Sequence, residues 1–298
     1  MIGKAFSADY YYHAREGDTI QNIFNAYFQS AYSGNEISDV DIDFKVFFEN
    51  VKLKNPRIYN WHNLKSGTMI EVPEVSQDKS KLSFGFFYTA SQGSFAEKLK
   101  TNSTTVNSNQ VSPITFGFMS QLQFKGTNSV LPISAYVSHL NASSISGAEG
   151  RADEKLNIPL EIGGNLYYQY SLVSLHLSPY VGFDFEKFTT FNAADLENGD
   201  PLTTRQNSLL YATGGLGYNF LYDQFKIYVK ASYSKSINSS TTSQKSEDRF
   251  TGNRYMLYLN IKKSGPFLMH LFYKYHQLTG PTELSINRVG IGFGYIIF

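Results

Sequence analysis

The chain has 298 residues, which is enough for one barrel and one small domain. A net charge of +1 argues against nucleic acid as the main partner, and zero cysteines exclude disulfides and thiolate metal sites. Mean hydropathy is -0.28 and no apolar run reaches the length of a transmembrane helix, so the chain is either soluble or a β-barrel. An aromatic share of 16% favours a membrane barrel, whose aromatic residues form belts at both interfaces.

Residues 1–8 lack the apolar stretch of a signal peptide. Their Ala-Phe-Ser-Ala ending has the small residues of a cleavage site, which leaves open that the numbering starts inside a trimmed precursor.

Residues 9–76 do not alternate like the rest of the chain and are predicted to form a small βααβ domain. Residues 10–15 predict a short strand rich in Tyr and His, after which Asp18 or Thr19 is placed to cap a helix. The apolar face of that helix is predicted to hold Ile20, Ile23, Phe24 and Tyr27.

A second helix is predicted over residues 41–53, after a polar stretch. It ends at Asn55, because a residue that precedes proline, here Pro56, is driven out of the α region. A turn at 64–67 and a strand at 69–73 complete the domain. The inner face of the second helix is predicted to hold Phe44, Phe47, Phe48 and Val51.

This order of elements, together with several spaced residues, resembles the LysM domain. The matching residues are the Tyr/His strand, Gly17-Asp18-Thr19, Asn55-Pro56 with Ile58, the turn from Leu64 to Gly67, and Ile70, Val72 and Pro73. The resemblance covers about a fifth of the chain. This chain departs from the family in its longer segment between the helices, at residues 29–39.

The resemblance implies a domain that binds N-acetylglucosamine-containing glycans, above all peptidoglycan. The groove lies between the first strand–helix loop and the loop after the second helix, where backbone amides and an apolar wall can hold a sugar acetamide. The implied glycan-binding residues are Gly17, Asp18, Thr19, Asn55, Pro56, Arg57 and Ile58. Two alternatives stay open: these residues only cap and end the helices, and Trp61 either stacks on a sugar or belongs to the core.

After a polar linker at 74–80, residues 81–298 alternate with a period of two. Ten apolar rows, of which Leu82, Phe84, Phe86 and Tyr88 form the first, predict a transmembrane antiparallel up-and-down β-barrel of about ten strands, with eight or twelve as alternatives. Short connections alternate with long polar ones, predicted at about 93–111, 142–155, 189–206 and 238–252. Short turns on one side are typical of outer-membrane barrels, which turn them to the periplasm.

The last predicted strand, residues 288–298, has apolar residues at alternate positions and ends on Phe298. It resembles the C-terminal strand of bacterial outer-membrane β-barrels, where a terminal Phe belongs to the signal read by the assembly machinery. This chain departs from that family in the phase of the alternation, because the positions on the same side of the strand as Phe298 include the glycines at 290, 292 and 294. In a closed barrel this strand pairs with the first one. An ordinary buried C-terminal strand is the alternative.

A soluble barrel, with its apolar rows inward, is a second structural alternative. Large apolar rows, small polar rows and aromatic residues near strand ends favour the membrane barrel. The polar rows are then expected to line the lumen with charges of both signs, as a salt-bridged interior with little or no conductance. The predicted lumen residues are Glu161, Asp184, Glu186, Lys226, Lys230, Lys262, Lys274, Arg288, His176 and His270.

Among the six histidines, His139 and His276 are expected near outer strand ends, where acidic loop residues could approach them. Their spacing is not diagnostic, and no metal-ligand spacing, phosphate loop or nucleophile elbow is visible. The sequence therefore predicts no catalytic residues, no metal site, no cofactor and no enzyme.

The sequence as a whole predicts a periplasmic LysM-like domain at residues 9–76 and an outer-membrane β-barrel at residues 81–298, with long extracellular loops. The expected function is to tether the bacterial outer membrane to peptidoglycan. The expected partners are peptidoglycan, outer-membrane lipid and lipopolysaccharide, and the barrel assembly machinery. The alternative is a small transport or surface-recognition barrel in which the LysM-like domain serves only for placement.

Overall fold

The computed structural model describes residues 11–24, 44–72, 81–100, 105–124, 128–139, 142–146, 155–157, 159–172, 175–191, 195, 203–222, 225–242, 249–263 and 266–297. None of the described helices is long and apolar enough to cross a membrane.

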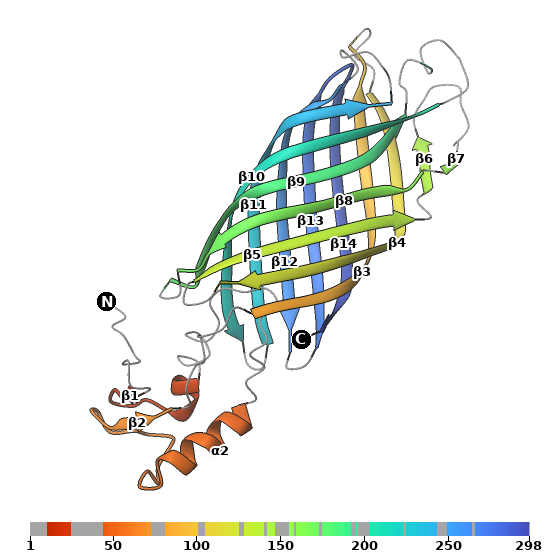
Figure 1. The fold of residues 1–298 in the computed structure, drawn as a ribbon. Helices are drawn as coiled ribbons and strands as arrows, with labels where there is room; N and C mark the ends of the chain where they lie inside the picture. Colours follow the sequence, from red (N-terminus) through yellow and green to blue (C-terminus); the bar gives the residue numbers. More distant parts are fainter. Residues whose placement is uncertain are drawn as a thin grey trace.

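The N-terminal unit has the predicted order of strand, helix, helix and strand (Figure 1). Strands β1 (Tyr11–His13) and β2 (Met69–Glu71) form an antiparallel pair in which Tyr12 lies opposite Ile70. Residues 20–24 are helical, and α2 spans Phe44–Lys54. The predicted face residue Tyr27 lies outside the described residues.

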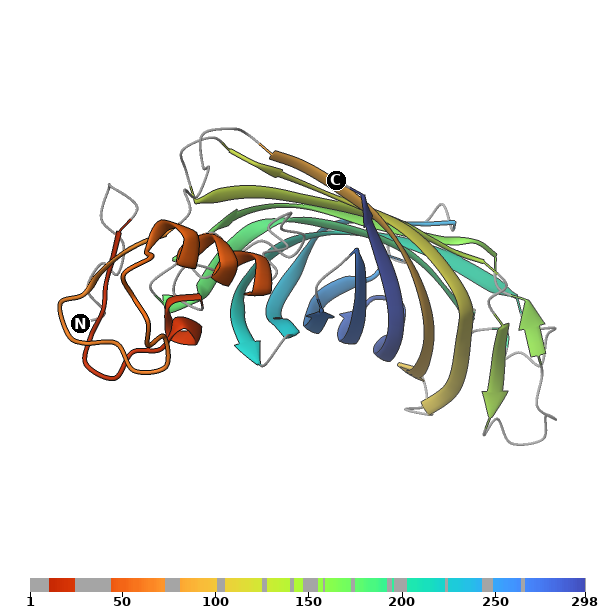
Figure 2. The same ribbon diagram turned by 90° about the horizontal axis from the view of Figure 1, so that it is seen from below.

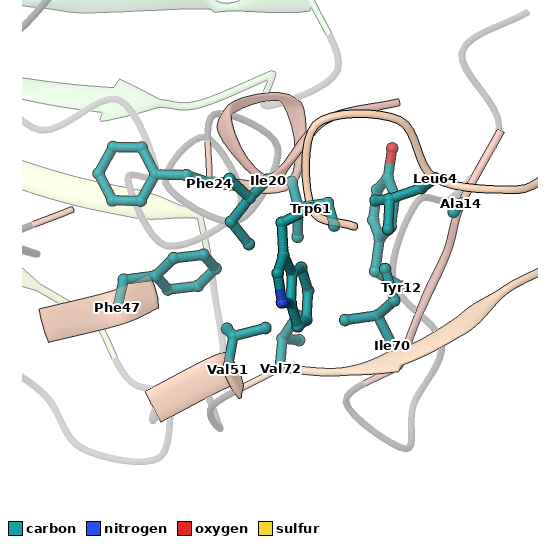
Figure 3. Packing of buried hydrophobic residues seen from close by; sticks show 11 residues of the cluster. Tyr12, Ala14, Ile20, Phe24, Phe47, Val51, Trp61, Leu64, Ile70 and Val72 are labelled. Atoms are coloured by element: carbon teal, nitrogen blue, oxygen red, sulfur yellow. The ribbon is translucent and has the colours of Figure 1, made fainter. Parts of the chain in front are cut away.

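One apolar cluster holds this unit together, with contributions from both strands, both helical segments and the loop after α2 (Figure 3). Trp61 lies inside it, only 6% exposed, with its ring edge-on to Phe48 at 5.8 Å between centroids. Trp61 is therefore a core residue. The cluster consists of Tyr12, Ala14, Ile20, Ile23, Phe24, Phe47, Val51, Trp61, Leu64, Ile70 and Val72.

Ten antiparallel strands form a closed barrel, as predicted (Figures 1 and 2). They are β3 (Lys81–Lys98), β4 (Thr105–Gln123), β5 (Ser129–His139), β8 (Glu161–Tyr170), β9 (Leu177–Phe191), β10 (Thr204–Tyr222), β11 (Phe225–Thr241), β12 (Thr251–Lys262), β13 (Phe267–Thr279) and β14 (Glu283–Ile297). The last strand closes on the first, with Ile297 opposite Phe84 and Glu283 opposite Lys98. The short strands β6 (Ala142–Ser146) and β7 (Lys155–Asn157) pair with each other, and β6 also pairs with residues 107–111 of β4.

The outer face of the barrel carries an apolar band. On β11 the outward positions from Phe225 to Tyr233 are all apolar, and at ~3.3 Å per residue and a tilt of ~40° they span roughly 20 Å. On β14 the outward side chains are Val289, Ile291, Phe293, Tyr295 and Ile297, each at least 41% exposed. A continuous exposed apolar band is unfavourable in water, so this part of the barrel lies in lipid. The alternative of a soluble barrel with inward apolar rows is wrong for this part of the chain.

Glycines on the inner face make room for rings from neighbouring strands. A Cβ at Gly290 would lie 2.4 Å from the ring of Phe272, and one at Gly292 would lie 2.4 Å from His270. The glycine parity of the last strand is therefore the lumen side. Phe298 lies outside the described residues.

Several predicted connections are wrong in extent, because the strands continue through them. β3 runs to Lys98, β9 runs to Phe191 and β11 runs to Thr241. Of the ten predicted apolar rows, the fourth, from Leu156 to Tyr170, is also divided, since Leu156 belongs to β7 and β8 begins at Glu161.

Polarity is reversed in these strand extensions. Their outer positions are mostly Ser, Thr, Asn and Lys, whereas their interior holds an apolar cluster, which we call the apolar layer, beside a few buried polar side chains. It consists of Phe95, Phe188, Leu209, Tyr211, Phe250, Leu278, Leu284 and Ile286. A barrel segment that stands in water buries its apolar side chains inside, so the extensions project beyond the membrane.

Candidate functional site

The first loop of the N-terminal unit is shaped by Gly17 and Asp18. Gly17 has a φ of +81°, a conformation that glycine adopts at little cost. The Asp18 carboxylate accepts hydrogen bonds from the Tyr12 hydroxyl at 2.7 Å and from the Arg15 amide at 2.8 Å. The Asp18 side chain therefore closes the loop onto β1.

Burial of Tyr12, and then its hydrogen bond to Asp18, raise the pKa of Tyr12 to about 12. The phenol therefore stays protonated at neutral pH and keeps donating to Asp18.

Thr19 caps the first helix by a reciprocal pair of bonds. Its hydroxyl accepts from the Asn22 amide at 3.2 Å, and the Asn22 side-chain oxygen accepts from the Thr19 amide at 2.9 Å. This is the geometry of a capping box. Of the two predicted capping residues, Thr19 is the cap.

Asn55 joins the end of α2 to β2. Its side-chain nitrogen donates to the carbonyls of Val51 at 2.8 Å and Glu71 at 2.7 Å, and its side-chain oxygen accepts from the Glu71 amide at 2.9 Å. All three bonds are internal to the fold. Beside them, Lys54 and Glu71 form an ion pair at 2.6 Å.

The two predicted groove loops are neighbours, and the bonds that join them run through residues 61–64. The Leu64 amide donates to the Asp18 carbonyl at 2.9 Å, and the Ile20 amide donates to the Trp61 carbonyl at 2.8 Å. The structure therefore brings the two loops together at their bases.

The predicted glycan-binding residues divide into two groups. Asp18, Thr19 and Asn55 use their side-chain polar groups in hydrogen bonds within the unit. The accessible residues are Gly17, Pro56, Arg57 and, in part, Ile58. Directly after them, Tyr59 is 92% exposed, an aromatic face that the sequence reasoning missed. The available signal was an aromatic residue outside any apolar periodicity.

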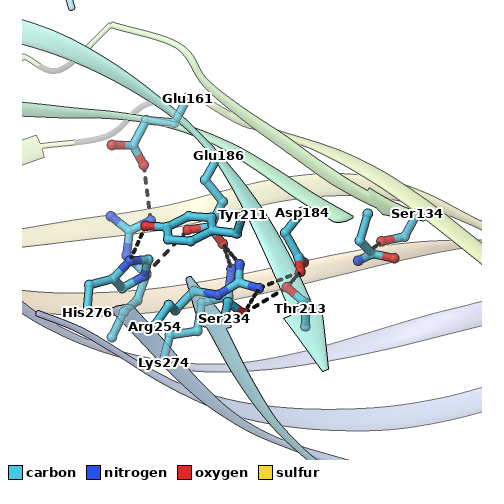
Figure 4. Close-up of polar contacts among 12 residues, drawn as sticks. Ser134, Glu161, Asp184, Glu186, Tyr211, Thr213, Ser234, Arg254, Lys274 and His276 are labelled. Atoms are coloured by element: carbon cyan, nitrogen blue, oxygen red, sulfur yellow. Dashed lines mark hydrogen bonds and ion pairs between the residues drawn. The ribbon is translucent and has the colours of Figure 1, made fainter. Parts of the chain in front are cut away.

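The barrel lumen holds a network of ion pairs centred on Arg254, which is 1% exposed (Figure 4). Arg254 contacts Asp184 at 2.6 Å and Glu186 at 2.9 Å, and Lys274 contacts Glu186 at 2.6 Å. Tyr167 and Thr213 also donate hydrogen bonds to Asp184. Charges in a low-dielectric interior require such partners, and here each carboxylate has several.

The network continues on both sides of Glu186. Arg288 forms an ion pair with Glu161 at 3.1 Å, and His276 lies 3.4 Å from Glu186 and 3.1 Å from the Tyr211 hydroxyl. These contacts link β8 and β9 across the lumen to β12, β13 and β14. They occupy the middle of the barrel, and the apolar layer lies between them and the end away from the short turns.

Most predicted lumen residues lie inside the barrel, with two corrections. His176 lies in the turn before β9, at a φ of +56°, with its ring against Tyr218 on the outer face. His276, expected near a rim, is 4% exposed within the lumen. The side chain of His139 lies outside those described.

The sequence reasoning missed Arg254 and a second lumen pair, Arg205 with Glu97 at 3.4 Å. All three residues lie in or beside stretches that the sequence predicts to be polar connections. The alternation along β12 could have identified Arg254, because Arg254 lies two residues before Met256, which faces the lumen. Across the part of the chain that the structure describes, no three His, Asp or Glu side chains gather into a metal site.

No family model matches the chain, and no curated protein matches it. Among solved structures it is similar to the outer membrane protease OmpT of Escherichia coli, at 7% identity and a TM-score of 0.47, over 74% of this chain and 98% of that one. It is also similar to the translocator domain of the autotransporter NalP of Neisseria meningitidis, at 11% identity and a TM-score of 0.37, over 71% and 88%. An outer membrane channel of Pseudomonas putida F1 matches at 10% identity and a TM-score of 0.40, over 76% and 100%. None of these likenesses is close enough to carry an activity to this chain, and the conclusion that it is a transmembrane β-barrel of the outer-membrane type rests on its closed sheet and apolar outer band.

Proposed function

We propose that this chain tethers a bacterial outer membrane to peptidoglycan. The barrel is the membrane anchor, and the N-terminal unit is a LysM-like domain that binds N-acetylglucosamine-containing glycan. The observation that carries the proposal is a unit with an apolar core of its own, which residues 73–80 connect directly to the first barrel strand.

The orientation of the barrel supports this proposal. An even number of strands puts the start of β3 and the end of β14 at the same end of the barrel, where β4–β5 and β10–β11 are joined by short turns (Figure 1). Outer-membrane barrels turn their short connections to the periplasm. The N-terminal unit would then stand on the side of the membrane where peptidoglycan lies.

The proposed glycan surface consists of the accessible residues of the two loops, Gly17, Pro56, Arg57, Ile58 and Tyr59. Tyr59 offers a flat face to a sugar ring, and Arg57 offers hydrogen-bond donors to its hydroxyl and acetyl groups. Asp18, Thr19 and Asn55 would shape the surface without contacting the glycan. Because binding is non-covalent, many weak contacts along one cell wall would act together.

The remaining partners follow from the barrel. Its apolar band would contact outer-membrane lipid, its extended rim would stand among lipopolysaccharide head groups, and its strands would be inserted by the barrel assembly machinery. The proposal contains no catalytic step and no cofactor.

Co-sedimentation with purified peptidoglycan sacculi tests the proposed site. The full chain in detergent should pellet with sacculi, and Tyr59→Ala together with Arg57→Ala should weaken binding by about tenfold or more, as loss of ~1.4 kcal/mol predicts. Leu53→Ala is the matched control, since Leu53 is also an exposed apolar residue (78%) of the same unit. If the wild type and both variants pellet equally, the assigned glycan surface is wrong. If the wild type does not pellet, the proposed tethering function is wrong.

A second candidate is surface recognition, with the N-terminal unit used only for placement. It is favoured by the strand extensions, which give the outer rim a packed interior and hence a firm platform for loops. Binding of cells or matrix by the barrel alone, with no binding to sacculi, would support this candidate over the tether.

A further inference from the structure

A cavity of about 140 Å³ lies in the barrel lumen, between the ion-pair network and the end with the short turns. An apolar cavity of about 150 Å³ can hold one benzene molecule, whereas one water molecule needs ~10–15 Å³ of such volume. The lumen cavity therefore has room for one six-membered ring with small substituents, or for several waters. The apolar layer closes the opposite side, and a smaller buried cluster of Met119, Leu268 and Ile296 packs towards the short-turn end. A ligand that arrives from the short-turn end would pass beside this smaller cluster.

The walls of this cavity differ in character. Phe87, Met119, Met256 and Phe272, from β3, β4, β12 and β13, form what we call the apolar wall. The same strands also contribute polar groups beside these side chains, among them Thr115 and Gln121, and β5, β8 and β9 contribute a polar wall that includes Ser134, Ser138, Asn165 and Asp184. Apolar side chains beside convergent polar groups are a common lining of a small-molecule site.

His270 lines this cavity, and only one of its two ring nitrogens has a hydrogen-bond partner among the described residues. The residue is 2% exposed, its Nε2 is 2.7 Å from the Thr89 hydroxyl, and its ring is edge-on to Phe87 at 5.6 Å. Among the described residues, Nδ1 has no hydrogen-bond partner. A buried ring nitrogen without a partner is costly, so this atom indicates a ligand group or an ordered water.

We propose that the lumen cavity binds a small, neutral, monocyclic aromatic alcohol. Its ring would lie on the apolar wall, and its hydroxyl would pair with Nδ1 of His270. A hydroxyl can both donate and accept, so it fits either tautomer that Thr89 imposes on the histidine. A neutral molecule is required, because Asp184 and Glu186 are already paired with Arg254 and Lys274 and a charged ligand would add an unbalanced buried charge.

Crystals of the full chain soaked in 4-bromophenol test this site, since bromine can be located by its anomalous scattering. A bromine peak should appear inside the lumen of the wild type. Bromobenzene, which leaves Nδ1 unpaired, should bind about fivefold or more weakly, as the loss of a ~1 kcal/mol hydrogen bond predicts, and give a correspondingly weaker peak in soaks below saturation.

Two variants complete the experiment. His270→Phe keeps a ring and removes the nitrogen, so the lumen peak should weaken about fivefold or more. Met256→Trp adds bulk to the apolar wall and should remove the peak. Should one variant fail to fold, the other decides. The proposal is overturned if bromine is found only on the outer face, if the wild-type cavity holds water alone, or if a folded variant keeps the full wild-type peak.

Discussion

At the scale of single residues, the N-terminal unit uses side chains that the LysM resemblance assigns to ligand binding to hold its own loops. Asn55 makes three hydrogen bonds within the fold, Thr19 caps a helix and Asp18 closes a loop. Sequence alone identified these positions because polar residues at helix ends are a strong signal. It could not decide between a structural and a binding role, because that depends on where the side chain points.

Asn55→Ala should lower the free energy of opening the N-terminal unit by about 2–3 kcal/mol, because it removes three partly buried hydrogen bonds. Hydrogen exchange of the amides in residues 11–24 and 44–72 of the full chain measures this. Asn60→Ala is the control, with one exposed bond to the His62 amide and an expected change within about 0.5 kcal/mol. Equal exchange in both variants would contradict the assigned role of Asn55.

Tyr12 should make the N-terminal unit sensitive to alkaline pH. Its pKa is raised from an ordinary value of 10.0 to about 12 in the folded state. A raised folded pKa adds stability that is fully present below pH 10 and is lost as the pH rises through about 12. The tyrosinate absorbance of the wild type minus that of Tyr12→Phe should therefore titrate near pH 12; a midpoint near 10 would contradict the buried hydrogen bond.

At the scale of elements, a single rule explains the barrel and also the main error of prediction. Alternation within the membrane places large apolar residues outward, and the rows from Leu82 to Tyr88 and from Val289 to Ile297 were identified on that basis. In the extensions the apolar residues turn inward and the outer positions are polar. An apolar alternation of one fixed parity therefore predicts a loop where a strand continues into water. For this reason the sequence did not predict Arg254 and Glu97 as lumen residues.

Arg254→Ala should destabilise the barrel by about 3–5 kcal/mol, because Asp184 and Glu186 would lose a fully buried partner. Urea unfolding from lipid vesicles measures the change. Lys235→Ala, on the exposed side of β11, should change stability by no more than about 0.5 kcal/mol. A loss below ~1 kcal/mol for Arg254→Ala would mean that the network contributes little.

At the scale of the whole molecule, buried side chains cross the described part of the lumen at two levels. The apolar layer and the buried pair of Arg205 with Glu97 lie towards the end away from the short turns, and the ion-pair network crosses the middle. Purified protein in planar bilayers should therefore give no steady single-channel steps at neutral pH. Stable, reproducible steps would contradict the closed lumen and favour the transport alternative.

The proposed tether connects a membrane to a cell wall through one molecule. Proteoliposomes that carry the full chain should pellet with peptidoglycan sacculi at low speed, and those that carry only residues 81–298 should stay in suspension. Soluble N-acetylglucosamine oligomers in excess should release the bound vesicles. Vesicles that stay in suspension with the full chain, or pellet equally with the barrel alone, would contradict the tether.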